Sequence, residues 1–251
     1  MITNPESQTR VDEVAEGIYR ISTPVPPSVM AGGFSFNQYL VVDEQPLLFH
    51  TGARRLFPLV RQAVGAVLPA ERLRFIALSH VEADECGSLN DFLAIAPNAQ
   101  PLGSQVAATI SLGDLADRQA RGLGDGEEVS LGRRTVRWLD ASHLPHGWEC
   151  GYLFDTLSQT LLCGDLFTQP GADNPPLTTS DILGPSEAMR ADLDYFAHGS
   201  SQSARIERLA GLHPTTLACM HGSAWHGDGA ALLRALRDAL AAPPRPEAVR
   251  K

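Results

Sequence analysis

The hydrophobic residues of this chain recur at two spacings, and each spacing predicts a different kind of element. Short alternating or continuous apolar runs predict strands at 17–21, 36–42, 47–49, 74–78, 135–139, 152–154, 160–163 and 216–220. Apolar residues three and four positions apart predict helices at 56–67, 89–95, 187–196, 203–212 and 230–240. Strands precede helices in both halves, so we expect an α/β protein in which two sheets are sandwiched between helices.

No segment of the sequence has the composition of a linker between independently folding domains. We therefore expect one domain over residues 1–251. The polar segment 1–12 and the segment 242–251, which contains three prolines, are expected to be flexible tails.

Composition and charge narrow the class of protein. Hydrophobic residues make up 43% of the 251 positions and charged residues 20%, which is typical of a globular protein. The formal net charge of −9 argues against nucleic acid or an anionic membrane surface as a partner. No apolar run has transmembrane length, and residues 1–10 lack the apolar core of a signal peptide. Four cysteines without metal-site or disulfide spacing fit a reducing cytoplasm.

Acidic residues and one histidine directly follow the predicted strand at 74–78. His80, Glu82 and Asp84 occupy alternate positions in this segment. Their side chains point the same way if the segment stays extended, and they surround one point if it turns. In either conformation, an imidazole nitrogen and carboxylate oxygens can meet in a small volume.

Three later strands also end next to a potential ligand, namely His143, Asp165 and His221. Loops at strand ends are where a rigid scaffold can hold functional side chains in alignment. Clustered carboxylates repel each other, and a bound cation removes that repulsion. Any one of these segments alone is explained by a structural or surface role, but four together predict a metal site.

These motifs resemble the metallo-β-lactamase superfamily, in which a His-x-His-x-Asp-His segment is followed by a His, a bridging Asp and a final His. Here Glu replaces the second His, and His80-x-Glu82-x-Asp84 is similar to the flavodiiron proteins and their single-domain relatives, the oxygen-binding diiron proteins. The remaining motifs are matched by His143-Leu144-Pro145, Gly164-Asp165-Leu166-Phe167 and His221-Gly222. The resemblance spans residues 17–240 and implies a four-layer αββα metallo-β-lactamase-type sandwich with a dinuclear site.

The resemblance implies a set of ligands for each of two ions. One ion is assigned to His80, Glu82 and His143, and the other to Asp84 and His221, with Asp165 as the bridge. This set is rich in oxygen and contains no thiolate, which favours iron over the zinc of histidine-rich hydrolase sites. Manganese fits the ligands nearly as well, and zinc remains an alternative. No residue is assigned a catalytic role beyond metal binding.

Four further residues are candidates for supporting roles near the site. Glu85 stands where the family commonly has His. Weak binding to the second metal is one alternative, and a non-ligand role, orienting a neighbour or capping the next helix, is favoured. His50, where many relatives have Asp, is a candidate for a hydrogen bond to a ligand or for a buried structural role. His146 competes with His143 as a ligand, and His143 is preferred because a proline follows it at the family's offset. Tyr195 is a candidate hydrogen-bond donor near the ions.

The resemblance implies a non-haem diiron protein that binds or reduces dioxygen or a related small oxidant, as a sensor or an oxidoreductase. No flavin-binding segment is recognised, so no flavin is expected on this chain and a reductase would need a separate electron donor. A homodimer is expected because flavodiiron relatives work as dimers. The alternative is a dinuclear hydrolase of the same superfamily that cleaves a thioester, a lactone or a phosphoester. Glu82 and Glu85, where such hydrolases have His, argue against it.

Overall fold

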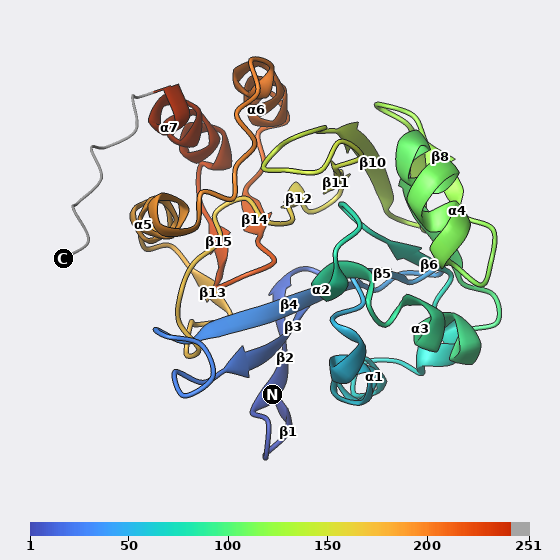
Figure 1. The fold of residues 1–251 in the computed structure, drawn as a ribbon. Helices are drawn as coiled ribbons and strands as arrows, with labels where there is room; N and C mark the ends of the chain where they lie inside the picture. The colour runs from blue at the N-terminus through green and yellow to red at the C-terminus, as the bar shows by residue number, and fades with distance from the viewer. Residues whose placement is uncertain (242–251) are drawn as a thin grey trace.

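The computed structural model describes residues 1–241, and the flexible tail expected at 242–251 lies outside them. In the described chain two β-sheets pack face to face, and helices cover the outer face of each sheet (Figure 1). Residues 2–123 form the first sheet and residues 128–226 form the second. This is the αββα arrangement that the sequence predicts.

The first sheet of the described chain has eight strands, which lie side by side in chain order. They are β1 (Ile2–Asn4), β2 (Thr9–Ala15), β3 (Ile18–Val25), β4 (Phe34–Val41), β5 (Leu47–Phe49), β6 (Phe75–Ala77), β7 (Gln100–Ser104) and β8 (Arg121–Leu123). Neighbours from β1 to β5 run antiparallel. Neighbours from β5 to β8 run parallel, so their carboxyl ends meet at one edge of the sheet.

The second sheet has seven strands within residues 1–241. In spatial order they are β13 (Leu177–Thr178), β15 (Ala224–His226), β14 (Thr216–Ala218), β12 (Thr160–Leu162), β11 (Gly151–Asp155), β10 (Thr135–Asp140) and β9 (Glu128–Ser130). β12 and β14 are parallel neighbours, with Leu162 opposite Ala218. Residues just beyond the ends of these two strands therefore lie next to each other.

Helices from the two halves of the chain cover different sheets (Figure 1). The first sheet carries α1 (Phe57–Gly65), α2 (Ala83–Cys86), α3 (Leu89–Ile95), α4 (Leu112–Leu115) and helical turns at Arg54–Leu56, Ala70–Arg72 and Ala107–Ser111. The second sheet carries α5 (Leu183–Leu193), α6 (Gln202–Ala210) and α7 (Gly229–Ala241). Five of these helices lie where the sequence predicts them, although α5 begins and ends earlier than expected.

Alternate residues of the central strands face two different cores. In β5, Leu47 and Phe49 contact the core between the sheets, whereas Leu48 contacts the helices. In β12, Leu162 faces the inter-sheet core and Leu161 faces the helices. Burial of both faces explains why these strands are continuous apolar runs in the sequence. It also fixes their register, and with it the place where each strand ends.

The N-terminal segment differs from the flexible tail expected at residues 1–12. It forms β1 and β2, which extend the edge of the first sheet. Arg10 lies opposite Ser22 of β3, while Val11 and Val14 are buried in the two cores that flank the sheet. The segment is ordered because β2 pairs with β3 and β1 pairs with β2, which the polar composition of its sequence does not reveal.

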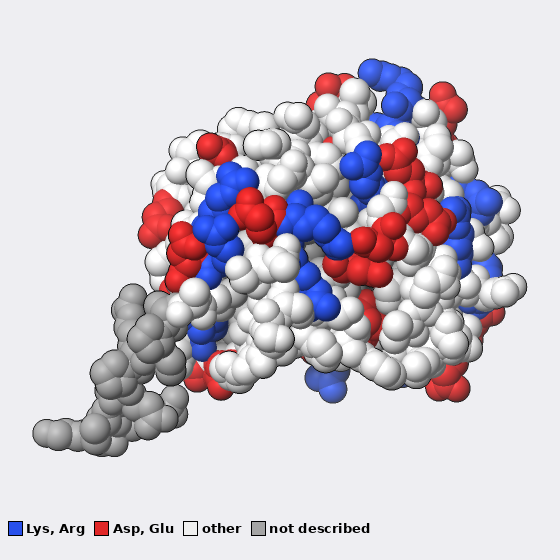
Figure 2. Space-filling model, turned by 90° about the horizontal axis from the view of Figure 1, so that it is seen from above, with Lys and Arg blue, Asp and Glu red and all other residues white. Residues whose placement is uncertain are grey.

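Basic and acidic side chains are interspersed on the face of the molecule that Figure 2 shows. Several pairs of opposite charge occur on the surface, including Arg208 Nη1 and Asp125 Oδ2 at 2.6 Å. Exposed pairs of this kind contribute little to stability. Within residues 1–241, no helix is both long and apolar enough to cross a membrane.

Candidate metal centre

The strand ends of the two sheets bring the predicted ligand segments together. His80 and Glu82 lie in the loop between β6 and α2, and Asp84 lies in α2 itself. Asp165 and His221 follow β12 and β14 at the same offset, and these strands are parallel neighbours. The first three side chains therefore come from the first sheet and the last two from the second.

The Asp165 carboxylate lies between two groups of side chains. Its Oδ2 atom is 3.4 Å from His80 Nε2 and 3.3 Å from His146 Nε2. Its Oδ1 atom is 3.4 Å from His221 Nε2. One carboxylate oxygen thus faces each group, which is the arrangement that a carboxylate bridge between two ions requires.

Two further carboxylates belong to the two groups. Glu82 Oε1 is 3.2 Å from His146 Nε2 and 3.8 Å from His80 Nε2. Asp84 Oδ2 is 3.6 Å from His221 Nε2. The Glu82 side chain is 51% exposed, whereas the His80 side chain is 1% exposed. The first group therefore opens toward solvent on its Glu82 side.

The structure brings His146, and not His143, into the first group. His143 is exposed, has a φ of 62°, and donates its backbone N–H to the carbonyl of Gly147 at 2.6 Å. This tight turn leaves the His143 side chain in solvent and places the His146 ring 4.8 Å from that of His80. The sequence-based preference for His143 is corrected on this geometry, because the offset of the following proline does not decide which side chain the turn directs inward.

The imidazoles of His146 and His221 are each held through their Nδ1 atom. His146 Nδ1 donates a hydrogen bond of 2.8 Å to the backbone carbonyl of Tyr195, and His221 Nδ1 donates one of 2.8 Å to the carbonyl of Ser35. His221 also stacks on Phe34, with the ring centroids 4.3 Å apart. Because a carbonyl can only accept, Nδ1 carries a proton in both residues, and Nε2 offers its lone pair to the centre when the ring is neutral.

A buried chain of hydrogen bonds through Ser79 and His50 holds the His80 imidazole at its Nδ1 atom. Ser79 Oγ lies 2.9 Å from His80 Nδ1 and 2.8 Å from His50 Nε2. The Ser79 N–H donates to His50 Nε2 at 3.3 Å, which makes that nitrogen an acceptor and leaves the His50 proton on Nδ1, 3.0 Å from Met220 Sδ. The Ser79 hydroxyl then donates to His50 and accepts from His80 Nδ1. His80 therefore also presents Nε2 to the centre.

Burial and the charges of the cluster shift the pKa values of several of its members. Burial lowers the pKa of His146, but hydrogen bonds with Asp165 and Glu82 outweigh this effect and raise the pKa to about 10. Burial opposes ionisation of Asp165, yet hydrogen bonds with His146 and His221 hold its pKa well below the usual value. In the ion-free protein, a proton on His146 Nε2 therefore lies among His80, Glu82 and Asp165, where the first ion would bind.

Two buried residues at the cluster have pKa values set mainly by burial. Burial, reinforced by the charge of His80, lowers the pKa of His50 to about 3, so that His50 is neutral at physiological pH. Burial, and then the charges of Asp165 and Asp84, raise the pKa of Glu85 well above its usual value. Within residues 1–241, neither Glu85 oxygen has a hydrogen-bond partner, so the helix-capping role considered from the sequence is not seen.

The donor atoms of the cluster fit a pair of divalent ions. Buried oxygens without a partner within residues 1–241 include both carboxylate oxygens of Glu85, and an ion would satisfy them. Three sets of ligand atoms each lie within 4.8 Å of one another: His80, His146 and Asp165; His80, Glu82 and Glu85; and Asp84, Glu85 and His221. Imidazole nitrogens with many carboxylate oxygens and no thiolate suit iron or manganese.

Several residues that support the site are absent from the sequence-based predictions. Ser79 links two histidines, and its position directly before His80 is the only local signal that could have identified it. Ser35 and Thr51 come from distant parts of the chain. Thr51 directly follows the candidate His50, whereas nothing in the sequence around Ser35 marks it. Tyr195, a candidate hydrogen-bond donor from the sequence, contributes its backbone carbonyl rather than its hydroxyl, and burial raises the pKa of that hydroxyl to about 12.

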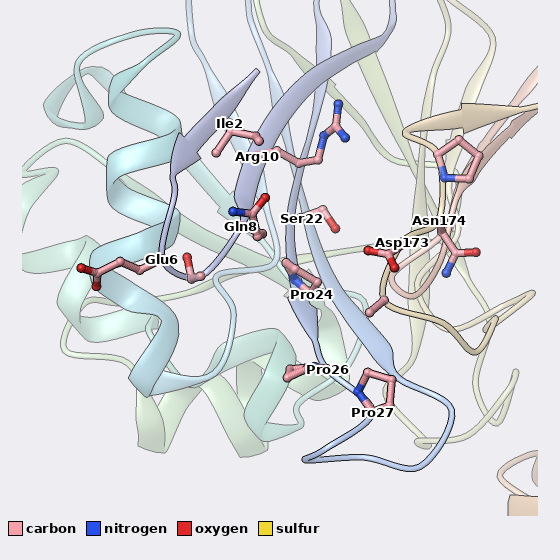
Figure 3. A pocket seen from close by; sticks show the side chains of 13 residues that line it. Ile2, Glu6, Gln8, Arg10, Ser22, Pro24, Pro26, Pro27, Asp173 and Asn174 are labelled. Atoms are coloured by element: carbon pink, nitrogen blue, oxygen red, sulfur yellow. The ribbon is translucent and has the colours of Figure 1, made fainter.

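A separate groove of about 480 Å³ lies between the N-terminal strands and the loop at 172–175 (Figure 3). Arg10, Pro24 and Asn174 are among the residues that line it, and none of the cluster residues does. Arg10 Nε is paired with Asp12 Oδ2 at 2.5 Å, so its charge is already balanced. Because none of the cluster residues lines the groove, it does not belong to the metal centre.

Comparison with solved structures places the fold among flavodiiron cores. The rubredoxin oxygen:oxidoreductase from Desulfovibrio gigas matches with a TM-score of 0.80 and 18% identity, over 94% of this chain and 63% of that chain. The flavodiiron protein from Giardia intestinalis matches with a TM-score of 0.77 and 18% identity, over 92% of this chain and 59% of that chain. These likenesses confirm the predicted metallo-β-lactamase-type sandwich.

Comparison with curated sequences identifies relatives of the same kind. A putative diflavin flavoprotein A 2 from Nostoc sp. (strain PCC 7120) is 25% identical over 169 residues, which are 66% of this chain and 28% of the relative. The rubredoxin-oxygen oxidoreductase from Megalodesulfovibrio gigas is 27% identical over 210 residues, which are 78% of this chain and 50% of the relative. A family profile described as ODP family beta lactamase matches residues 34–222. Because this match covers most of the sequence, the chain belongs to the ODP family of β-lactamase-type proteins.

Proposed function

We propose that this chain is a non-haem diiron protein that reacts with dioxygen or a related small oxidant. The observation that carries the proposal is the Asp165 carboxylate, whose two oxygens face two separate groups of nitrogen and oxygen ligands. One ion would be held by His80, Glu82 and His146, and the other by Asp84 and His221, with Asp165 contributing an oxygen to each. The oxygen-rich, thiolate-free set supports iron as the metal.

The residues of the chain orient the ligands and leave one side of the site accessible. When bound, the two ions supply electrons and open coordination positions to the oxidant. Ser79 and the Tyr195 carbonyl fix the rings of His80 and His146, so both Nε2 atoms are aligned before an ion binds. Glu82 is half exposed and borders the route by which a small molecule reaches the first group.

The printed names of the relatives support an oxidoreductase. One curated relative is named as an oxidoreductase for rubredoxin and oxygen, and others are named as diflavin flavoproteins. The chain spans half or less of the length of these two curated relatives. In our proposal it binds no flavin of its own, receives electrons from a separate donor, and works as a homodimer in the cytoplasm. The four thiols, all unbridged, are compatible with that reducing compartment.

The hydrolase alternative has less support. Glu82 lies within hydrogen-bonding distance of His146, in the place where hydrolases of the superfamily have another histidine. The curated relatives are flavoproteins and an oxygen oxidoreductase. A zinc-loaded protein that gives no spectral response to air would nevertheless favour hydrolysis over oxidant chemistry.

Metal analysis and an absorbance spectrum test the proposed function. Protein purified without chelators should contain about two irons per chain, with a near-ultraviolet or visible band that bleaches on anaerobic reduction and returns in air. Asp165→Asn should lose iron from one or both positions, whereas Asp173→Asn, an exposed aspartate of the loop that follows, should keep both. Retention of two irons and of the air-sensitive band in Asp165→Asn would show that the bridging assignment is wrong.

A further inference from the structure

Glu85 is held in place by its backbone while its side chain enters the cluster. The N–H and the hydroxyl of Thr51 both donate to the Glu85 carbonyl oxygen, at 2.7 Å and 2.9 Å. The Glu85 side chain is 1% exposed. Thr51 directly follows His50, so the segment that orients His80 through Ser79 also fixes the position of Glu85.

The Glu85 carboxylate makes no hydrogen bond within residues 1–241 that would explain its burial. The nearest basic atom in an ion pair is His80 Nε2, 3.9 Å from Glu85 Oε2, which is too far for a hydrogen bond. A buried carboxylate without a hydrogen bond is strongly unfavourable, and the charge of the neighbouring Asp84 carboxylate adds to the cost of ionising Glu85. A structural role for Glu85 therefore leaves its polar atoms unexplained.

The Glu85 carboxylate is within reach of both groups of ligands. Its oxygens lie within 4.8 Å of ligand atoms of His80 and Glu82, and also of ligand atoms of Asp84 and His221. The second group contains only Asp84, His221 and the bridging Asp165 if Glu85 is left out. It is therefore the group that gains most from a further oxygen ligand.

We propose that Glu85 is a metal ligand that completes the second ion position, beside Asp84 and His221. The proposal rests on the proposed diiron function. It assigns four carboxylates to the centre, those of Glu82, Asp84, Glu85 and Asp165, together with three neutral imidazoles. Four negative charges balance two divalent ions, and this balance favours burial because an uncompensated charge is costly in a site of low exposure.

Anaerobic titration with Co²⁺ as the probe tests the proposal without relying on turnover. Visible absorption of bound Co²⁺ reports the number of equivalents and their affinities in the wild type, Glu85→Gln and Glu85→His. The Gln variant is nearly isosteric but removes the charge, whereas the His variant restores a metal-binding side chain at the same position. Circular dichroism and the thermal midpoint of each ion-free variant show whether the fold is kept.

The proposal predicts that the wild type binds about two equivalents of Co²⁺. In Glu85→Gln the second equivalent should be lost, or bound more than about tenfold more weakly. Glu85→His should recover the second equivalent, which a merely structural role would not predict. Equal affinity for two equivalents in the wild type and Glu85→Gln would overturn the role of Glu85 and leave the diiron function intact. Fewer than two equivalents in the wild type would overturn both.

A crystal structure of the wild type loaded with Co²⁺ provides a second test that needs no variant and decides the matter if Glu85→Gln does not fold. A Glu85 oxygen about 2.0–2.2 Å from the second ion supports the assignment. A Glu85 oxygen more than about 3 Å from both ions overturns it.

Discussion

The Nε2 atoms of His80 and His146 lie 3.2 Å apart. Each ring is fixed from its other side, His80 by the Ser79 hydroxyl and His146 by the carbonyl of Tyr195. Two nitrogen lone pairs that face each other at this distance repel unless a proton or a metal ion lies between them. In the ion-free protein the proton on His146 Nε2 lies between the two nitrogens, in the place that a metal ion would take.

Replacement of His146 should impair the metal centre, and the same change at His143 should not. His146→Ala removes a nitrogen ligand of the first ion and should lower the metal content by about one equivalent per chain. His143→Ala removes an exposed side chain and should keep both equivalents. Metal analysis of the two purified variants distinguishes them. Loss of metal from the His143 variant alone would restore the sequence-based assignment.

Metal binding should compete with a proton on His146. The pKa of this residue is raised to about 10, chiefly by hydrogen bonds with Asp165 and Glu82 that outweigh burial, so the ring is protonated at neutral pH in the ion-free protein. An ion can bind Nε2 only after that proton leaves. The apparent affinity for Co²⁺ should therefore rise by about tenfold or more per pH unit between pH 6 and 8. An affinity that does not change over this range would contradict the prediction.

The ion-free protein should lose stability in acid because of His50. Burial and the charge of His80 lower its pKa from 6.5 to about 3 in the folded state. As the pH falls from 6.5 toward 3, the unfolded chain therefore binds a proton at His50 that the folded chain excludes. The free energy of unfolding is unaffected by protonation of His50 above pH 6.5 and decreases over this range. The expected loss from this residue is about 3 kcal/mol between pH 7 and pH 4.

Urea unfolding of the wild type and His50→Asn over this pH range measures that loss. The asparagine variant cannot take up the proton, so its free energy of unfolding should fall less steeply between pH 7 and pH 4. Identical slopes for the two proteins would show that His50 titrates normally in the folded state.

Packing between β10 and β11 should not tolerate a methyl group at Gly151. A Cβ atom there would lie 2.1 Å from Cζ2 of Trp138, which is fully buried between the sheets. Gly151→Ala should therefore destabilise the protein by about 1–3 kcal/mol. Gly65→Ala is the matched control, because a Cβ atom in that part of α1 meets nothing within 4 Å. The control should be neutral or stabilising by about 0.5–1 kcal/mol in the same unfolding experiment.

Much of the fold follows from the sequence because both faces of the central strands are buried. β6 and β12 are recognisable as continuous apolar runs, and His80 and Asp165 follow their ends as expected from the sequence. β1 and β2 are not recognisable, because backbone pairing of β1 with β2 and of β2 with β3, rather than a run of apolar residues, orders them. Ser35 is not recognisable either, because its contact with His221 joins residues far apart in the chain and leaves no local signal in the sequence.

Two features of the site depend on local turns that spacing alone does not determine. The turn closed by the hydrogen bond from His143 to Gly147 decides that His146 faces the cluster. The change from extended chain at Glu82 to helix at Ala83 brings Glu85 inward, although its position in the sequence suggests a cap. In both cases the residue types indicate the chemistry, and the backbone conformation selects which side chain takes part.

The ligand-bearing loops come from both sheets, since His80 follows β6 of the first and Asp165 follows β12 of the second. An ion bound to both residues closes a ring across the layer interface, so the two layers cannot separate until a metal–ligand bond breaks. Separation of the two sheets at this edge then requires that the ligands of one sheet release the ion, so a bound ion opposes that separation.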